Sequence, residues 1–308
     1  MAESKTFIRR AGHAAVVATA LVVFAVSGTG CVTNAHYMTE NIDLADVTQP
    51  GADQAAVSMW VATRGCIDGD TCSGGVRLST GYVWFFAMEV DVATSADSND
   101  VWGLHGGLAF GGSGQQSSLY ADWSGYCPAS QGGLALRAGG SPCKTPNSNP
   151  TFKPHTVTGL SEQQWYRVTI RKVSCTTSEA TDVAGTLTGW QMTVTAQATG
   201  LVSDAGTWCI PNASMIAHIS LFSELNEPDP CTTDLWGVHM SDPEVHLPSG
   251  WLASATAHGH YNGGGTSGDA NCANTNLRTA GTHYFIDERG TVRGSNGGLA
   301  SDGWLWQQ

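Results

Sequence analysis

The sequence predicts an all-β protein: a sandwich or jelly roll of two antiparallel sheets. Tyr82–Val92 alternates with period two, its even positions apolar and its odd positions ending in Glu89 and Asp91, which is typical of a half-buried strand. Further short strand-like segments follow, bounded by Gly, Pro, Asn or Ser. No long helical period occurs after the first 31 residues. An apolar fraction of 41% is enough to build a core.

The first 30 residues are predicted to be an export signal rather than part of the fold. Arg9 and Arg10 provide the positive start, and Ala14–Val26 is an apolar run broken only by Thr19. This run is too short for a transmembrane helix, and small residues follow it up to a cysteine. We therefore expect residues 1–30 to be a lipoprotein-type signal peptide and the protein to be extracellular.

Cys31 is the expected lipidation site. Small residues precede it and resemble a bacterial lipobox, although Gly28 stands where Leu is usual. An acyl chain at Cys31 would hold the protein at a membrane surface, as a cell-surface lipoprotein. Ordinary cleavage nearby, for example after Ala35, would instead release a secreted protein.

Cysteine usage predicts disulfides, because an exported chain meets an oxidising compartment. Of the nine cysteines in the sequence, all except Cys31 remain for pairing. Eight cysteines allow about 105 connectivities. Since short loops close most easily, we expect neighbours to pair in sequence order: Cys66–Cys72, Cys127–Cys143, Cys175–Cys209 and Cys231–Cys272.

The expected elements follow one another as short strands. Residues 31–55 are polar and are predicted to be a tether and first loop, with a first strand as the alternative. Residues 56–308 are expected to form one domain. Its further strands are predicted at Val57–Thr63, Gly106–Phe110, Ser118–Trp123, Gly133–Arg137, Trp165–Val173, Trp190–Ala196, Ile216–Ser223 and Leu235–Met240.

The last sixty or so residues differ in composition. Residues 248–308 are predicted to be a loop-rich C-terminal extension of the same domain. Within it, Ala257–Asn276 is rich in Gly, Asn, Ser and His and is predicted to be a long loop. His283–Asp287 and Gly290–Arg293 are predicted to be the two strands of an edge hairpin.

Charge and motif content exclude several classes of function. The whole chain carries a formal charge of −12, and the signal removes three of its basic residues, so no basic stripe remains for nucleic acid. The sequence has no Cys-x-x-Cys pair, which would indicate zinc, and no Gly-x-Ser-x-Gly elbow, which would indicate a serine hydrolase. We expect no cofactor and no nucleic-acid partner.

The carboxylates Glu89 and Asp91 are the first catalytic candidates, because residues two apart on a strand share a face. The segment MEVDV resembles the first half of the Glu-x-Asp-x-x-Glu signature of laminarinase-like glycoside hydrolases, which have a concanavalin A-like jelly-roll fold. The acid/base glutamate of that signature is missing, since Ala93 and Thr94 follow. A solvated strand face is therefore the preferred interpretation, and the enzyme question stays open, leaning toward no enzyme.

Aromatic residues beside the strands suggest carbohydrate binding, because aromatic rings stack on sugar rings. Most Trp residues of a sandwich belong to its core, and only two or three are expected to be exposed. The ligand-binding candidates are Trp102, His105, Trp123, Tyr126 and Glu224, and Glu224 is also a third catalytic candidate.

Structural calcium is an open alternative for the acidic turns, although none matches a full calcium-loop spacing, and no metal site is assigned. The acidic residues concerned are Asp68, Asp70, Asp97, Asp100, Glu224, Glu227 and Asp229. His258 and His260 lie in a Gly-rich stretch, and His218 and His239 lie on predicted strands.

Several segments taken in order resemble an uncharacterised, actinobacterial-type family of secreted bacterial proteins with a concanavalin A-like sandwich. They are GLHGGLAF, SLYADWSGYC, QWYRVTIRKV, GWQMTVTA, ISLFSELNEPDPC and WGVHMSDPEV. The resemblance implies a fold and a location but no chemistry. We therefore expect an exported, lipid-anchored sandwich that binds a glycan. The alternatives are a polysaccharide-cleaving enzyme of the same fold and a non-catalytic surface interaction protein.

Overall fold

Two antiparallel sheets make up the described part of the chain. The computed structural model describes residues 33–39, 56–64, 83–94, 101–111, 118–128, 155–161, 164–175, 187–226, 236–241, 244–247, 250–253, 256–261, 275–279, 284–289, 293–301 and 303–307. Within these ranges the elements are strands and one 3-10 turn, η5 (Ser295–Gly297). Contacts group Val32–Gln308 into one compact unit and Met1–Cys31 into another.

The first sheet has eight strands in which neighbours run antiparallel. Their order is β17 (Gly303–Gln307), β14 (Thr256–Tyr261), β1 (Thr33–Thr39), β10 (Met215–Asn226), β3 (Val83–Ala93), β4 (Trp102–Gly111), β5 (Ser118–Tyr126) and β6 (His155–Val157).

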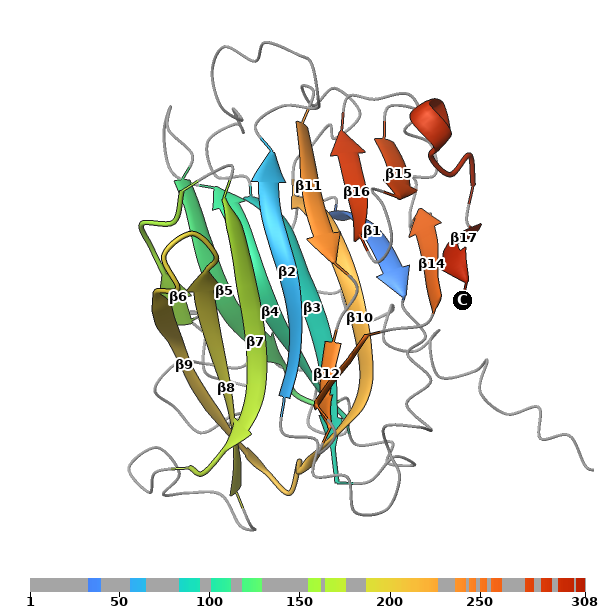
Figure 1. Ribbon diagram of the computed structural model, residues 1–308. Coiled ribbons are helices and arrows are strands. Elements are labelled where there is room, and N and C mark those ends of the chain that lie inside the picture. Colours follow the sequence, from blue (N-terminus) through green and yellow to red (C-terminus); the bar gives the residue numbers. More distant parts are fainter. Residues whose placement is uncertain are drawn as a thin grey trace, which may run out of the picture. The chain divides into compact units, whose positions relative to one another are not determined.

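The second sheet has nine strands, again antiparallel. Its main order is β15 (Thr275–Thr279), β16 (Tyr284–Arg289), β11 (Trp236–Ser241), β2 (Ala56–Arg64), β7 (Trp165–Val173), β8 (Leu187–Ala196) and β9 (Val202–Pro211). Off this path, β12 (Glu244–Leu247) pairs with β2 and with β13 (Gly250–Ala253). In Figure 1 the strands β2, β7 and β8 lie in front of β3, β4 and β5. The all-β prediction, with two antiparallel sheets, is therefore confirmed.

The core lies between the two sheets. Phe86, Met88 and Leu104 from the first sheet and Ile170 and Met192 from the second are all fully buried in one cluster. The sheets approach so closely that a Cβ added at Gly106 of β4 would meet Ile170 Cδ1 at 2.7 Å and Met192 Sδ at 2.8 Å. Burying this apolar surface is the main stabilising contribution to the fold.

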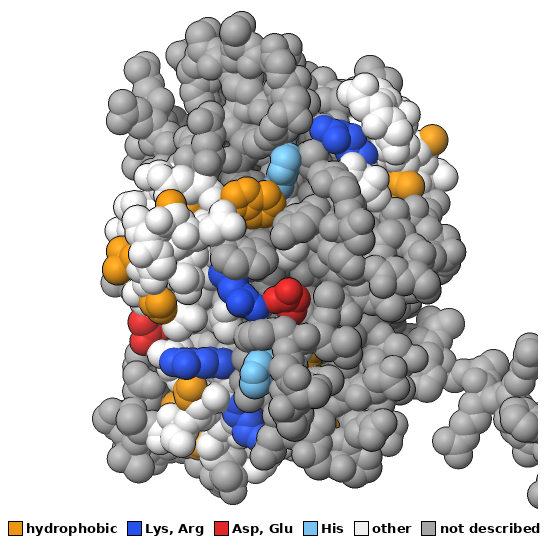
Figure 2. Space-filling model, in the orientation of Figure 1, with side chains coloured by type: hydrophobic (Ala, Val, Ile, Leu, Met, Phe, Trp, Pro, Cys, Tyr) orange, Lys and Arg blue, Asp and Glu red, His pale blue; other side chains and the backbone are white. Residues whose placement is uncertain are grey.

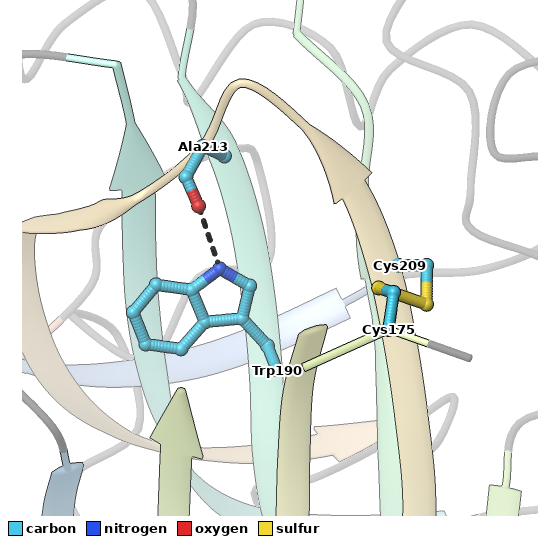
Figure 3. Close-up of a disulfide and its surroundings, with 4 residues drawn as sticks. All are labelled: Cys175, Trp190, Cys209 and Ala213. Atoms are coloured by element: carbon cyan, nitrogen blue, oxygen red, sulfur yellow. Dashed lines mark hydrogen bonds between the residues drawn. A yellow bond between two sulfur atoms is a disulfide. The ribbon is translucent and has the colours of Figure 1, made fainter. Parts of the chain in front are cut away.

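A buried hydrogen bond and a disulfide stabilise the region around β8 and β9. The Trp190 indole is fully buried, and its Nε1 donates to the Ala213 carbonyl oxygen at 2.9 Å, as Figure 3 shows. The predicted Cys175–Cys209 disulfide is present, with Cα atoms 5.8 Å apart. It joins the chain just after β7 to β9, the strand two positions along the sheet. Cys127 is also disulfide-bonded, and its partner and the other predicted pairs lie outside the described residues.

Period-two alternation predicted the central strands well. Strand β7 has the predicted bounds, and its Tyr166, Val168 and Ile170 are buried while the residues between them are partly exposed. The predicted strands at 57–63, 82–92, 106–110, 118–123, 190–196, 216–223, 235–240 and 283–287 overlap β2, β3, β4, β5, β8, β10, β11 and β16. Gly133–Arg137 lies outside the described residues.

The predictions for the two ends of the chain were partly wrong. Strand β14 occupies the start of the predicted loop 257–276, because pairing with β1 and β17 outweighs a Gly- and His-rich composition. Arg293 and Gly294 form a turn and not a strand, and Gly294 has a positive φ of 76°. Residues 33–39 form strand β1 between β10 and β14, which agrees with the first-strand alternative. The extension beyond residue 248 adds strands to both sheets.

Candidate functional site

The outward side of β3 carries the carboxylates that the sequence singled out. Phe86, Met88 and Val90 are fully buried on the inner side, so Glu89 and Asp91 face the other way and are partly exposed. The alternation predicted for this strand is therefore confirmed. The role of the two carboxylates remains a hypothesis.

Strand register brings polar residues of neighbouring strands together on this side. Glu89 of β3 lies opposite His105 of β4, which lies opposite Ser124 of β5. Asp91 and Tyr126 lie opposite Gly103 in the next row. We call the polar and aromatic residues that face outward on these strands, together with Phe222 of β10, the polar face. Its members are Phe85, Glu89, Asp91, His105, Tyr120, Asp122, Ser124, Tyr126 and Phe222.

Carboxylates converge at one end of the polar face. A Cβ added at Gly103 would lie 3.4 Å from Glu89 Oε1 and 3.5 Å from Asp91 Oδ1. The same Glu89 oxygen lies 3.7 Å from His105 Nε2, with the two side chains 27% and 14% exposed. Both carboxylates therefore lie close over Gly103 of β4, beside the imidazole.

A continuous row of rings crosses the polar face; we call it the aromatic row. Phe85 and Phe222 stack with centroids 6.4 Å apart. The His105 ring meets Phe222 edge-on at 5.3 Å and Tyr126 at 5.2 Å. Strand β3 runs between β4 and β10, so His105 and Phe222 meet across it. They can do so because Ala87, the β3 residue in register with Phe222, has only a methyl group.

Asp122 of β5 is a site residue that sequence reasoning missed. It is 2% exposed, and its Oδ2 accepts a hydrogen bond from Ser124 Oγ at 3.0 Å. Burial raises the pKa of Asp122 to about 6, although the Ser124 hydrogen bond and the nearby His105 act in the opposite direction. Burial and the neighbouring Asp122 also raise the pKa of Tyr120 to about 12. The alternation of β5 placed Asp122 outward, but nothing in the sequence indicated its burial.

The structure separates the sequence-predicted binding residues into two groups. His105 and Tyr126 lie on the polar face. Trp102 and Trp123 are 3% and 0% exposed and belong to the core, so they are not available to stack on a sugar. Each lies on the inward side of its strand, where most Trp residues of a sandwich are expected. Glu224 lies on β10 in register with Phe85, and its side chain is outside the described residues.

Other candidates cannot be placed or are not assembled. Cys31 and the acidic turns containing Asp68, Asp97 and Asp229 lie outside the described residues, as do the remaining calcium candidates of those turns. Within the described part, His, Cys, Asp and Glu side chains form no group of three or more suited to a metal. The described ranges also include no apolar helix of membrane-spanning length.

The outward side of the second sheet carries a different set of side chains. Arg167 Nη2 donates to Glu244 Oε2 at 2.6 Å. Arg171 donates to Gln191 Oε1, and Nε2 of the same amide donates to Asp204 Oδ2 at 2.7 Å. Trp165 packs against His239 with ring centroids 5.9 Å apart. Figure 2 shows basic side chains in blue along β7 on this side. These residues are paired with one another in the described part, which makes them useful as control positions.

Comparisons with known proteins identify no family. No protein-family model matches the chain, and a search of curated proteins finds no match. Two solved structures of scytalido-glutamic peptidase, one with a transition state analog inhibitor and one with a peptide-based analog, align with TM-scores of 0.42 and 0.39 at 12% identity. The alignments cover 84% and 85% of this chain and 100% of those chains.

SCP-B, an Eqolisin-family peptidase in complex with the tripeptide Ala-Ile-His, aligns with a TM-score of 0.39 at 11% identity. That alignment covers 84% of this chain and 100% of that one. Likeness at this level assigns neither a shared site nor a shared activity.

Proposed function

We propose that this chain is an exported protein that binds carbohydrate through the polar face. The single observation that carries the proposal is the pair of partly exposed rings His105 and Tyr126 with the carboxylates of Glu89 and Asp91 beside them. Phe222, which is 3% exposed, packs against His105 and is not itself available to a ligand. Aromatic rings cover the apolar faces of a sugar, and carboxylates accept hydrogen bonds from its hydroxyl groups. A few polar groups beside apolar ones are the usual composition of a small-molecule site.

The location and the finer fold belong to the same proposal. The signal-like segment before Cys31 supports export, with acylation of Cys31 as the anchor. Intact-mass measurement of the mature protein tests this, because a diacylglycerol group adds a defined mass to Cys31. We assign the sandwich to the concanavalin A-like jelly rolls on the sequence resemblance.

A glycan array with the chain from Val32 to Gln308 tests the binding proposal. Starting at Val32 keeps β1 whole, since that strand begins at Thr33. We expect binding to at least one glycan class, weakened by about tenfold or more in Tyr126→Ala and Glu89→Gln, as for central interface residues.

The matched control for the array is Arg171→Ala. Arg171 is exposed on the outward side of the second sheet, so the variant removes a large polar side chain away from the polar face. Its binding should equal that of the parent chain. Silence of the folded parent across all glycans would sink the proposal and favour a surface interaction protein. Undiminished binding in both Tyr126→Ala and Glu89→Gln would show that binding occurs elsewhere.

Cleavage of a polysaccharide is a second candidate, favoured by Asp122. Glycosidases need one carboxyl that holds its proton and another that is ionised, and Asp122 is a carboxyl with raised pKa on the same face as Glu89 and Asp91. Incubation with the array-positive glycan, followed by a reducing-end assay, distinguishes the two functions. Release of new reducing ends that stops in Asp122→Asn supports cleavage, and intact glycan supports binding alone.

A further inference from the structure

Asp122 is placed where a change in its charge acts on His105 and Tyr120. Ser124 lies two residues along the same side of β5 and holds Oδ2 through a hydrogen bond of 3.0 Å. The neighbouring residues in register are Gly107 of β4 and Thr156 of β6, neither of which carries a charge. The nearest titratable group from β4 is His105, whose charge favours the ionised form of Asp122.

The other carboxyl oxygen of Asp122 has no such support. Oδ1 is buried and finds no hydrogen-bond partner among the described residues. An ionised carboxylate with an unpartnered buried oxygen is costly, so the acid form is favoured.

The remaining charged groups around Asp122 lie at the edges of the same face. Glu89 of β3 pairs with His105 at 3.7 Å, and Asp91 lies one row further, with His218 of β10 in register with it. Tyr120, the outward neighbour along β5, holds its proton because its pKa is raised to about 12. His105 is therefore the group through which ionisation of Asp122 acts on the aromatic row.

We propose that Asp122, Ser124 and His105 form a pH-sensitive unit that sets the charge of the polar face. In the acid state Asp122 is neutral, and Glu89 pairs with the imidazole. In the ionised state His105 lies between two carboxylates, which stabilise its protonated form and draw its ring from Phe222 toward β5. The aromatic row is then altered at its centre, so ligand binding changes with pH.

Carbon-13 NMR titration of the Val32–Gln308 chain tests the unit without any ligand. We expect one aspartate carboxyl to titrate near pH 6, absent in Asp122→Asn, with the His105 ring signals moving over the same range. Ser124→Ala should shift that midpoint to higher pH, because its hydroxyl stabilises the ionised form. Asp204→Asn, on the outward side of the second sheet, should change neither signal.

Two outcomes would overturn the unit. One is a normal midpoint near pH 4 for Asp122. The other is His105 ring signals that titrate identically in the parent chain and in Asp122→Asn. The effect on binding rests on the proposed function and is read separately, by running the glycan array at pH 5 and at pH 7.5. A pH-dependent glycan signal that becomes flat in Asp122→Asn supports the effect. A pH-independent signal rejects the effect on binding. No glycan signal at either pH, together with the expected Asp122 midpoint near pH 6, rejects glycan binding but not the unit.

Discussion

Ala87 shows how one small side chain allows a long-range contact. His105 and Phe222 belong to strands separated by β3, yet their ring centroids lie 5.3 Å apart. A larger side chain at position 87, which is fully buried, would separate the rings. The polar face therefore depends on small residues as much as on the aromatic and acidic ones that a sequence search finds.

Asp122 is expected to make the folded protein less stable as the pH rises. The folded chain keeps this proton until about pH 6, whereas the unfolded chain loses it near pH 3.8. The free energy of unfolding therefore falls between these values, by up to about 3 kcal/mol. The difference in free energy of unfolding between Asp122→Asn and the parent chain should therefore be larger at pH 7.5 than at pH 4 by about that amount in favour of the variant, measured by urea unfolding. A stability difference that is the same at both pH values contradicts this.

Single residues differ in how well the sequence predicted them. The outward position of Glu89 followed from alternation alone. Residue type could not assign Trp102 and Trp123 to the core or to a binding surface, because Trp occurs in both. Their inward positions depend on strand register, which fixes the side to which every residue of a strand points. The burial of Asp122 depends on neighbouring chain segments and cannot be read from its own strand.

At the scale of elements, β4 holds two consecutive glycines with different surroundings. A Cβ at Gly106 would meet the flexible ends of Ile170 and Met192, which can shift. A Cβ at Gly107 would instead overlap the backbone of Phe86 and Ala87 in β3. We expect Gly107→Ala to cost about 2 to 4 kcal/mol in thermal or urea unfolding and Gly106→Ala about 1 kcal/mol. Equal costs would show that the strands can move apart.

The Cys175–Cys209 disulfide closes the region around β8. The two cysteines are 34 residues apart in the sequence, and chain-entropy arguments give about 3 to 4 kcal/mol for a loop of this size. The double variant Cys175→Ser with Cys209→Ser should lose about that much stability in urea unfolding. Val202→Ser, a change at an exposed position of β9, serves as the control. A double variant as stable as the parent chain would contradict the prediction.

Elements with regular alternation were predicted, and those defined by pairing were not. Strand β7 alternates clearly and was predicted with its observed bounds. Strand β14 contains two histidines and a glycine in six residues and forms because β1 and β17 flank it. Its propensity is low, and only its neighbours in the sheet reveal it.

For the whole molecule, β1 is the connection between the C-terminal strands and the rest of the first sheet. It pairs with β10 on one side and with β14 on the other. Deleting residues 32–39 should leave both strands with unpaired edges and lower the melting temperature by 10 °C or so, or cause aggregation. Deleting only the last residue, Gln308, is the control. A deletion variant that melts like the parent would show that β14 and β17 pair elsewhere.

The position of β1 has a consequence for the timing of folding. This strand lies at the start of the mature chain that we propose, but its partners are residues 215–226 and 256–261. The first sheet therefore cannot be completed until nearly the whole chain is available, and such distant pairings are slow to form. If the chain crosses a membrane N-terminus first, β1 would stay unpaired until residues 215–226 and 256–261 have followed it across.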